Sequence, residues 1–171
     1  ASAYAFGGDL NNLDPAFDFW TQMAEDGRIN TLDILQQNFE TGEIPVGVIW
    51  SFTAIPYKDQ ITKYKLQANI PTDGSIMSGY ASVINKYAPH PCAAALAREY
   101  IFSDEGQANL AAAGAIPTRT DVEIPDDIQN ATFKSEDYAN AIPMEDTDAY
   151  TKACETVVER WQEEITPLLV Q

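Results

Sequence analysis

The chain has few of the residues that bind metals. Its 171 residues include two cysteines and one histidine. Cys92 and Cys154 stand far apart, form no CxxC pair and have only His90 as a further ligand, which argues against a zinc site. The cysteines either pair in an oxidising compartment or stay free as small core residues, and the sequence leaves both alternatives open. We therefore expect no metal and no cofactor.

Basic residues and long apolar runs are also scarce. Ten Lys and Arg stand against 26 Asp and Glu, so the formal net charge is −16. Such a field repels phosphate backbones, which makes nucleic acid and anionic membranes poor partners. No apolar run approaches the roughly 20 residues that span a bilayer, and no charged segment followed by an apolar one opens the chain. A mature or truncated product would look the same.

Catalytic motifs are absent as well. His90 lies between two prolines and beside Cys92, without a third group to orient it, so a turn or helix cap explains it better than catalysis. The carboxylate pairs Asp126–Asp127 and Glu163–Glu164 are typical of solvated surface in so acidic a chain. The sequence contains no phosphate loop, GxGxxG, EF-hand or HExxH motif. We expect no enzyme.

Helical patterns are present along most of the chain. Apolar residues recur at helical spacing from Asp14 to Gly27 and from Thr31 to Gly42, where glycine offers a left-handed end. Pro91 opens another predicted helix, and Ser103 caps the next one, which ends at Gly114. The clearest helix runs over 150–168 with Pro167 kinking or ending it, and its predicted apolar face is Tyr150, Cys154, Val157, Val158, Trp161, Ile165 and Leu168.

Strand patterns lie between these helices. Residues 44–49 form a continuous branched-apolar run, typical of a strand buried on both faces. The alternation over 66–70 and the run 76–84 predict two further strands, whereas 117–143 reads as loop with short elements. A helix, a glycine turn and a doubly buried strand in succession predict an α/β fold with a mixed sheet flanked by helices.

Aromatic and hydroxyl side chains lie at the predicted strand ends. Because open α/β sheets bind ligands at the carboxyl ends of their strands, we expect a concave pocket there. Core packing is the competing explanation, above all for Trp50 and Tyr80. The candidate ligand-binding residues are Trp50, Ser51, Tyr57, Ser78 and Tyr80.

Three stretches, in this order, resemble the type II extracytoplasmic solute-binding proteins of ABC importers, the group that includes ferric-iron, spermidine/putrescine and phosphonate or phosphosugar binders. The stretches are DPAFDFWTQMAEDGRI, FETGEIPVGVIWSF and IPTDGSIMSGYASVINKYAPHPCAAALAREYIFSDEGQANLAAAGAIPTR. The last is the most specific, because it holds the family's proline–alanine segment at 88–94, its S-x-E-G-Q motif at 103–107 and its G-x-x-P-x-R exit at 114–119.

The resemblance implies a type II periplasmic-binding-protein-like fold in which two lobes close at a hinge over a small solute. It covers the whole chain but corresponds to the later half of a typical member, as a fragment, proteolytic product or deliberate truncation would. The implied layout is 1–68 in lobe two, 69–108 across the hinge in lobe one, and 109–171 returning to lobe two. By position, Trp50 and Ser51 face the cleft from lobe two, and Ser78 to Tyr80 face it from lobe one.

Two departures from the family pattern bear on the ligand. The post-hinge stretch lacks the carboxylate of polyamine binders, and the chain lacks the adjacent tyrosines of many ferric-iron binders. An indole and hydroxyls suit a sugar phosphate or another phosphate ester, with an amine or ferric iron as alternatives. The implied partner is a membrane ABC permease, and the implied location is extracytoplasmic, either periplasmic or membrane-anchored at the cell surface.

A second class of function stays open. A truncated receptor lobe exposes apolar surface, so the chain could instead serve as a non-enzymatic interaction module or a swapped oligomer, including a homodimer of the fragment.

Overall fold

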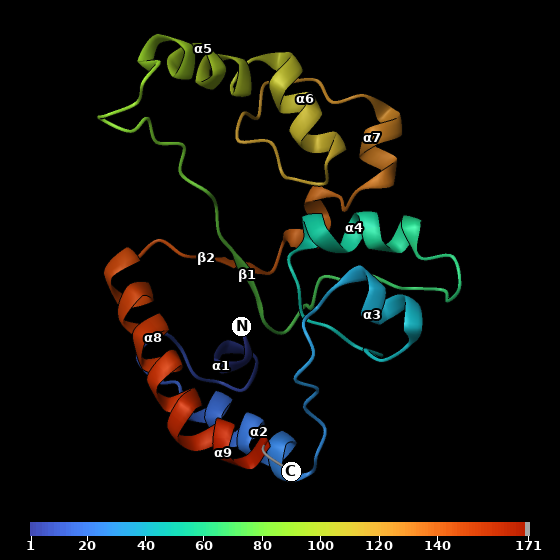
Figure 1. The fold of residues 1–171 in the computed structure, drawn as a ribbon, viewed down its shortest axis with the longest axis vertical. Helices are drawn as coiled ribbons and strands as arrows, with labels where there is room; N and C mark the ends of the chain where they lie inside the picture. Colours follow the sequence, from blue (N-terminus) through green and yellow to red (C-terminus); the bar gives the residue numbers. More distant parts are fainter. Residues whose placement is uncertain (170–171) are drawn as a thin grey trace. The chain divides into compact units, whose positions relative to one another are not determined.

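The computed structural model describes residues 1–169 and consists mostly of helices (Figure 1). The elements are α1 (Ser2–Ala5), α2 (Asp14–Glu25), α3 (Gln36–Thr41), α4 (Ser51–Gln60), β1 (Ser75–Met77), α5 (Pro91–Ile101), α6 (Asp104–Ala112), α7 (Asp126–Ala131), a 3₁₀ turn (Ser135–Tyr138), β2 (Ala141–Pro143), α8 (Thr147–Arg160), a π turn (Trp161–Ile165) and α9 (Thr166–Leu169). Helices and a small parallel sheet together make this an α/β chain.

The chain divides into two compact units, which we describe separately. Unit 1 holds residues 1–33 and 71–78 and the segment from 139 onward. Unit 2 holds 34–70 and 79–138. Each unit is therefore built from segments that lie far apart in the sequence.

The core of unit 1 lies between α2 and the C-terminal helices. Phe17, Ala24 and Ile165 are buried there, and half-buried residues pack around them. Trp20 meets Trp161 edge to face, with ring centroids 5.8 Å apart. The predicted helix from Asp14 is confirmed, and the chain leaves it at Gly27 with φ 66°, as predicted for a glycine C-terminus.

The C-terminal helix continues past the position where a proline should disturb it. Pro167 lacks an N–H, and its ring would clash with the carbonyl four residues earlier in a regular helix. The chain widens into a π turn over Trp161–Ile165, and the Thr166 hydroxyl donates to the Trp161 carbonyl at 3.1 Å. The helical path then runs on to Leu169, so Pro167 does not end it.

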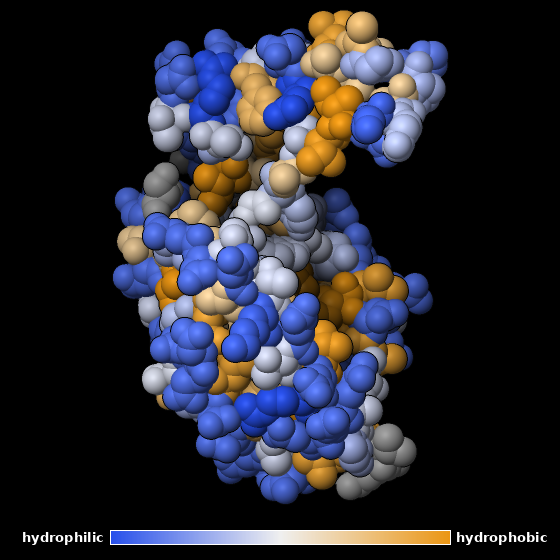
Figure 2. Space-filling view, turned by 90° about the vertical axis from the view of Figure 1, so that its left-hand side faces the viewer, coloured by the Kyte–Doolittle hydropathy of each residue, from blue (hydrophilic) through white to orange (hydrophobic). Residues whose placement is uncertain are grey.

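The predicted apolar face of this helix is only partly buried. Ile165 is fully buried, but Val158 is 58% exposed and Cys154 is also exposed. Figure 2 faces the side on which α8 lies and shows apolar patches among polar residues. Within the described residues, the part of this face at Cys154, Val157 and Val158 is therefore left uncovered.

The sheet of the described residues consists of two strands. β1 and β2 run parallel, with Ile76 opposite Ile142. The prediction of a strand over 76–84 was largely wrong, because the chain leaves the sheet after Met77 and Val83 is 84% exposed. The strand predicted over 66–70 is likewise absent.

The predicted buried strand over 44–49 is also wrong. The segment is irregular and pairs with no strand in the part of the chain that the structure describes, and an unpaired strand would leave its N–H and C=O groups unsatisfied. Ile44 is buried, whereas Val46 and Val48 are 82% and 78% exposed. The apolar run instead covers the ring of Phe39, which contacts the segment at Gly47.

The core of unit 2 lies where α3, the segment 44–49 and α4 meet. Phe39, Ile44 and Ile61 are buried, and Tyr57 and Leu66 pack against them. The predicted helix from Thr31 begins later, at Gln36, and Leu32 and Leu35 are exposed. Its predicted end is confirmed, since Gly42 adopts φ 82°.

Helices α5 and α6 begin where the sequence predicts. His90 is the N-cap residue of α5, and Pro91 follows in the first turn. The Ser103 hydroxyl accepts a hydrogen bond from Gly106 N–H at 3.1 Å, and Gly114 ends α6 with φ 88°. The apolar face predicted for α5 has no buried residue, and Leu96 is 71% exposed.

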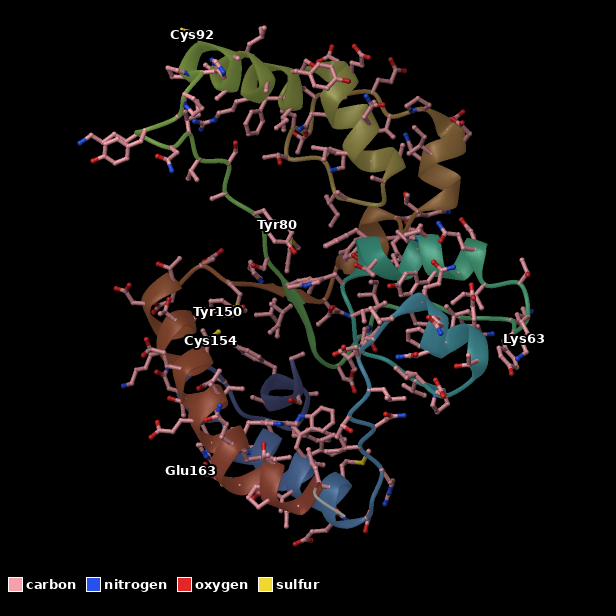
Figure 3. The ribbon with its side chains drawn as sticks, viewed as in Figure 1. Lys63, Tyr80, Cys92, Tyr150, Cys154 and Glu163 are labelled. Carbon is pink, nitrogen blue, oxygen red and sulfur yellow. The ribbon has the colours of Figure 1, made fainter. Side chains whose placement is uncertain are left out.

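The two cysteines are free and exposed in the structure. Cys92 lies at the start of α5 and Cys154 on α8, in different units (Figure 3). The expectation that free cysteines serve as small core residues is therefore wrong for both.

Candidate functional site

The candidate site is built on the first turn of α4, in unit 2. Trp50 is the N-cap residue of this helix, with extended backbone dihedrals, and its carbonyl accepts from the amides of Thr53 and Ala54. No side chain caps the helix, and its first turn contains no acidic residue. The first N–H groups therefore carry partial positive charge next to the indole.

Three aromatic rings meet at this turn. Trp50 and Phe52 lie nearly parallel, with an interplanar angle of 13° and centroids 6.4 Å apart. Tyr80 meets Phe52 edge to face at 6.2 Å. Trp50 is 48% exposed and Tyr80 is 83% exposed, so ring surface faces solvent. We call Trp50, Phe52 and Tyr80 the aromatic wall, and Figure 3 shows Tyr80 on the segment that follows β1.

A pair of hydroxyls lies beside the wall. The Ser51 side chain lies near the phenol of Tyr138, at the end of the 3₁₀ turn. Burial raises the pKa of Tyr138 above its ordinary value and outweighs the effect of Ser51, which acts in the opposite direction. Tyr138 also meets Phe133 edge to face at 6.0 Å. The phenol therefore stays protonated and available as a donor at neutral pH.

The end of α6 supports the first turn of α4 from behind. A Cβ at Gly114 would lie 3.2 Å from Phe52 Cα and 3.2 Å from Ile55 Cδ1. Only a glycine fits this approach without displacing Phe52, and only a glycine adopts the positive φ freely. Gly114 therefore sets the position of the aromatic wall.

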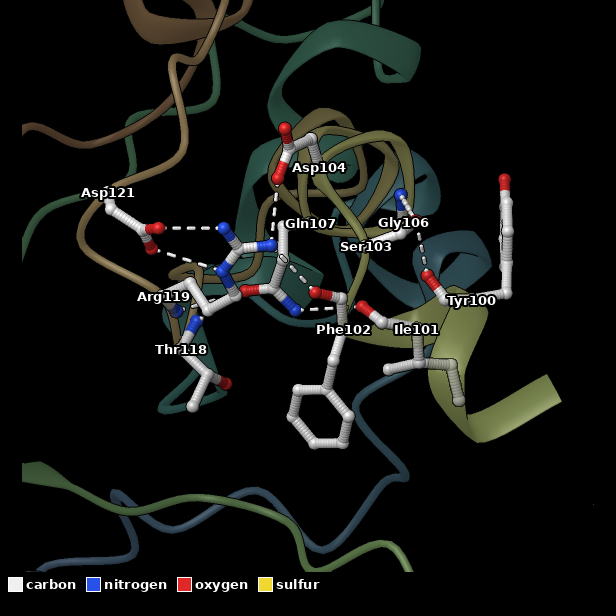
Figure 4. Close-up of polar contacts among 10 residues, drawn as sticks. All are labelled: Tyr100, Ile101, Phe102, Ser103, Asp104, Gly106, Gln107, Thr118, Arg119 and Asp121. Carbon is white, nitrogen blue, oxygen red and sulfur yellow. Dashed lines mark hydrogen bonds and ion pairs between the residues drawn. The ribbon is translucent and has the colours of Figure 1, made fainter. Parts of the chain in front are cut away.

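A hydrogen-bond clasp in turn fixes Gly114 and the segment after it (Figure 4). Gln107 is fully buried; its amide donates to the Ile101 carbonyl at 2.9 Å, and its oxygen accepts from the amides of Thr118 and Arg119 at 2.8 and 3.1 Å. Arg119 donates to the Phe102 carbonyl, to Asp104 at 2.7 Å, and to Asp121 through two nitrogens. Residues 103–107 and 114–119 thus form one structural unit behind the site.

The structure brings together three of the five residues predicted from the sequence. Trp50 and Ser51 stand on the same turn, and Tyr80 reaches that turn through Phe52. Tyr57 lies farther along α4, where its ring packs 6.0 Å from Phe39 beside the buried core. Ser78 is exposed and belongs to unit 1.

Phe52 and Tyr138 are contacts that the sequence reading missed. Phe52 follows Trp50 by two residues, and a strand extended through both would have placed the two rings on one face, so a signal was present. Tyr138 lies 87 residues after Ser51, in a stretch predicted as loop, and no sequence signal links the two.

Unit 1 contains a hollow of about 160 Å³ between the loop before α2 and α8. Arg160 lines it, but the guanidinium already donates to Asp14 at 2.8 Å and to Glu164 at 2.6 Å and stacks 4.0 Å from the centre of the Phe17 ring. The Glu164 hydrogen bond raises the pKa of Arg160, and the same bond lowers the pKa of Glu164. This arginine ties elements together and leaves no free charge for a ligand.

Residues 1–169 contain neither a membrane-spanning helix nor a metal-binding cluster of side chains. No helix there has both the length and the apolar character needed to cross a bilayer. No group of three or more His, Cys, Asp or Glu side chains there is placed to hold a metal ion.

Comparison with known proteins supplies the family. Curated proteins gave no significant match. Residues 2–142 match the family described as bacterial extracellular solute-binding protein, a description that places its members outside the cytoplasm and assigns them solute binding. The match includes the aromatic wall, the hydroxyl pair and the clasp. The chain therefore belongs to the family of bacterial extracellular solute-binding proteins.

Proposed function

We propose that this protein is the substrate-binding component of an ABC importer, which captures a small solute at the first turn of α4 and presents it to a membrane permease. The observation that carries the proposal is the aromatic wall, because exposed ring surface beside paired hydroxyls is typical of a ligand site and costly elsewhere. No chemistry on the solute is expected. The protein acts outside the cytoplasm, either in a periplasm or anchored at the cell surface.

The chemistry of the turn favours a neutral or anionic solute. Uncapped N–H groups at the start of α4 and the hydroxyls of Ser51 and Tyr138 are hydrogen-bond donors. A sugar phosphate or another phosphate ester offers acceptors to match them. An amine would rely on the ring faces alone, and ferric iron would need oxygen ligands that Ser78 and single tyrosines supply poorly.

In this proposal, the protein is a type II receptor whose two lobes close at a hinge. In that layout, 1–68 and 109–171 belong to one lobe and 69–108 completes the other, and Tyr57 and Ser78 join the cleft on closure. The chain passes between the compact units of the structure at 33–34, 70–71, 78–79 and 138–139, and only the passage at 70–71 lies near a predicted lobe boundary. The lobe boundaries stay a prediction.

A solute panel tests the proposal. The panel contains glucose 6-phosphate, glycerol 3-phosphate, spermidine and ferric citrate, measured by thermal shift and by tryptophan fluorescence. A binder at 100 times its dissociation constant adds about 2.7 kcal/mol of stability. The fluorescence response should vanish in Trp50→Phe, which leaves Trp20 and Trp161 in place.

Two tyrosines of equal exposure provide a matched control. Tyr80 and Tyr87 are both 83% exposed and lie in the same unit, but only Tyr80 touches the aromatic wall. Tyr80→Ala should weaken binding about 2- to 10-fold, because ring contacts contribute about 0.5–1.5 kcal/mol, and Tyr87→Ala should leave binding unchanged. Equal losses in both variants would show that the site lies elsewhere.

A homodimer or interaction module is the second candidate, favoured by the uncovered apolar residues. Val46, Val48, Leu96 and Val158 are each more than half exposed. Size-exclusion chromatography with light scattering separates the two functions. A dimer whose stability ignores every solute in the panel would support the module, and a monomer that responds to a solute would support the receptor.

A further inference from the structure

The aromatic wall offers two kinds of ring surface in one place. The near-parallel planes of Trp50 and Phe52 present flat faces, and Tyr80 stands across them at 72° to Phe52. Ring faces bind other rings by stacking, and they bind the C–H face of a sugar by dispersion and burial of apolar area. A flexible open chain gains less from such a surface, because it must lose rotational freedom to lie flat against it.

Polar groups lie close to these rings. Ser51 stands between Trp50 and Phe52 in sequence, and the phenol of Tyr138 lies near its hydroxyl. Phe52 itself is half-buried, and its backbone packs against Gly114, so the end of α6 supports this residue. The more exposed rings of Trp50 and Tyr80 both lie against Phe52, which makes it the central member of the wall.

We propose that the solute recognised at this site carries a five- or six-membered ring, aromatic or sugar, whose face lies against the wall, and that Phe52 is the residue that selects for the ring. This inference rests on the proposed function and narrows its ligand from phosphate esters, amines and iron in general to ring-bearing solutes. Phe52 does so by holding the face of Trp50 parallel to its own and by setting the edge contact with Tyr80. The ring stacks on the wall, and the polar substituent faces the hydroxyls.

Matched probe pairs test the selection for a ring. Phenyl phosphate is compared with methyl phosphate, and glucose 6-phosphate with glycerol 3-phosphate, so that each pair shares its charged group and differs in the ring. Dissociation constants are measured from Trp50 fluorescence, with Trp50→Phe as the blank. At least one ring probe should bind about 10-fold or more tightly than its ringless partner.

Variants at Phe52 test its role in that selection. Phe52→Leu keeps an apolar side chain but removes the ring, and should reduce the preference for the ring probe about 2- to 10-fold while leaving the ringless probe unchanged. Phe52→Trp retains a ring and should keep most of the preference. Phe102→Leu is the matched control in the same unit, because the Phe102 side chain lies outside the wall. Near-UV circular dichroism and thermal unfolding show whether each variant is folded.

The outcomes separate this inference from the proposed function. Equal binding of ring and ringless partners, or a panel in which only spermidine or ferric citrate binds, would overturn the selection for a ring and leave the receptor function standing. Absence of binding by every probe and every panel solute would overturn both. A ring preference unaffected in a folded Phe52→Leu protein would remove Phe52 from the proposal.

Discussion

At the scale of single residues, Gln107 is the most constrained side chain of unit 2. It is fully buried, donates one hydrogen bond and accepts two. In Gln107→Ala, one carbonyl and two amides lose their partner inside the protein, so we expect the free energy of unfolding to fall by roughly 2–4 kcal/mol. Urea unfolding measures this change.

The control for Gln107 is Gln129→Ala. Gln129 makes one exposed hydrogen bond, to the Ile124 carbonyl at 2.7 Å, and its loss should change the free energy of unfolding by less than about 0.5 kcal/mol. If Gln107→Ala and Gln129→Ala lowered the free energy of unfolding equally, the burial of Gln107 would add nothing to stability.

Asp121 gives a prediction on pH. The hydrogen bonds from Arg119, more than any other cause, lower the pKa of Asp121 below its ordinary value of about 3.9. A carboxylate with a lowered pKa stabilises the folded state above its unfolded-state pKa, and this stabilisation is lost as pH falls through the folded-state pKa. The stability difference between wild type and Asp121→Asn should therefore be constant above about pH 5 and shrink below about pH 4.

Chemical denaturation at several pH values measures this difference. Glu123→Gln, at an exposed carboxylate two residues away, is the control and should show a smaller dependence. If the stability of wild type relative to Asp121→Asn instead increased as the pH falls, the pKa of Asp121 would be raised in the folded state and not lowered.

At the scale of elements, Gly114 couples the end of α6 to the start of α4. Gly114→Ala adds the strain of a positive φ and a close contact with Phe52, so the cost should be roughly 2–3 kcal/mol, and binding of a panel solute should weaken with it. Gly27→Ala adds only the strain, because nothing lies within 4 Å of its Cβ position, and should cost about 1 kcal/mol.

Thermal unfolding and the fluorescence titration measure the two effects of these glycine variants. If both variants lose the same stability and both keep full solute binding, the contact between Gly114 and Phe52 does not position the wall.

At the scale of the whole molecule, the two units have separate cores. Phe17 lies in the core of unit 1 and Phe39 in that of unit 2. Each change to alanine should destabilise its own unit by about 3–5 kcal/mol, since it leaves a cavity in a small core. Hydrogen exchange should show lost protection mainly in 14–25 for Phe17→Ala and mainly in 36–60 for Phe39→Ala. Equal loss in both units for either variant would show that they unfold as one.

The local signals in the sequence were reliable where a few neighbouring residues decide the conformation. Glycine at 27, 42 and 114 follows the end of its helix, Ser103 caps α6, and Pro91 opens α5, each as predicted, and all three glycines adopt positive φ. These features depend on the chemistry of one residue and its immediate neighbours, so the sequence specifies them. The grouping of Trp50, Ser51 and Tyr80 as one binding site stays a prediction.

Strands and apolar faces were predicted less well, because each depends on a partner distant in the chain. The run 44–49 is apolar enough for a buried strand but has no strand to pair with among the described residues, and Val158 lies on a helix face that no described element covers. Periodicity reports how a segment is able to pack, and the tertiary contacts decide whether it does.

The sequence alone determined the acidic, metal-poor composition, the ends of α2, α3 and α6, the starts of α5 and α6, and the resemblance to solute-binding proteins. Only the tertiary structure revealed α4, placed Phe52 and Tyr80 at the same turn as Trp50, brought Ser51 near Tyr138, and showed that Gln107 and Arg119 hold the segment behind them. The physical reason is that stacking and hydrogen bonding act through space over a few ångströms. Residues as distant in sequence as Ser51 and Tyr138 meet only after the chain has folded.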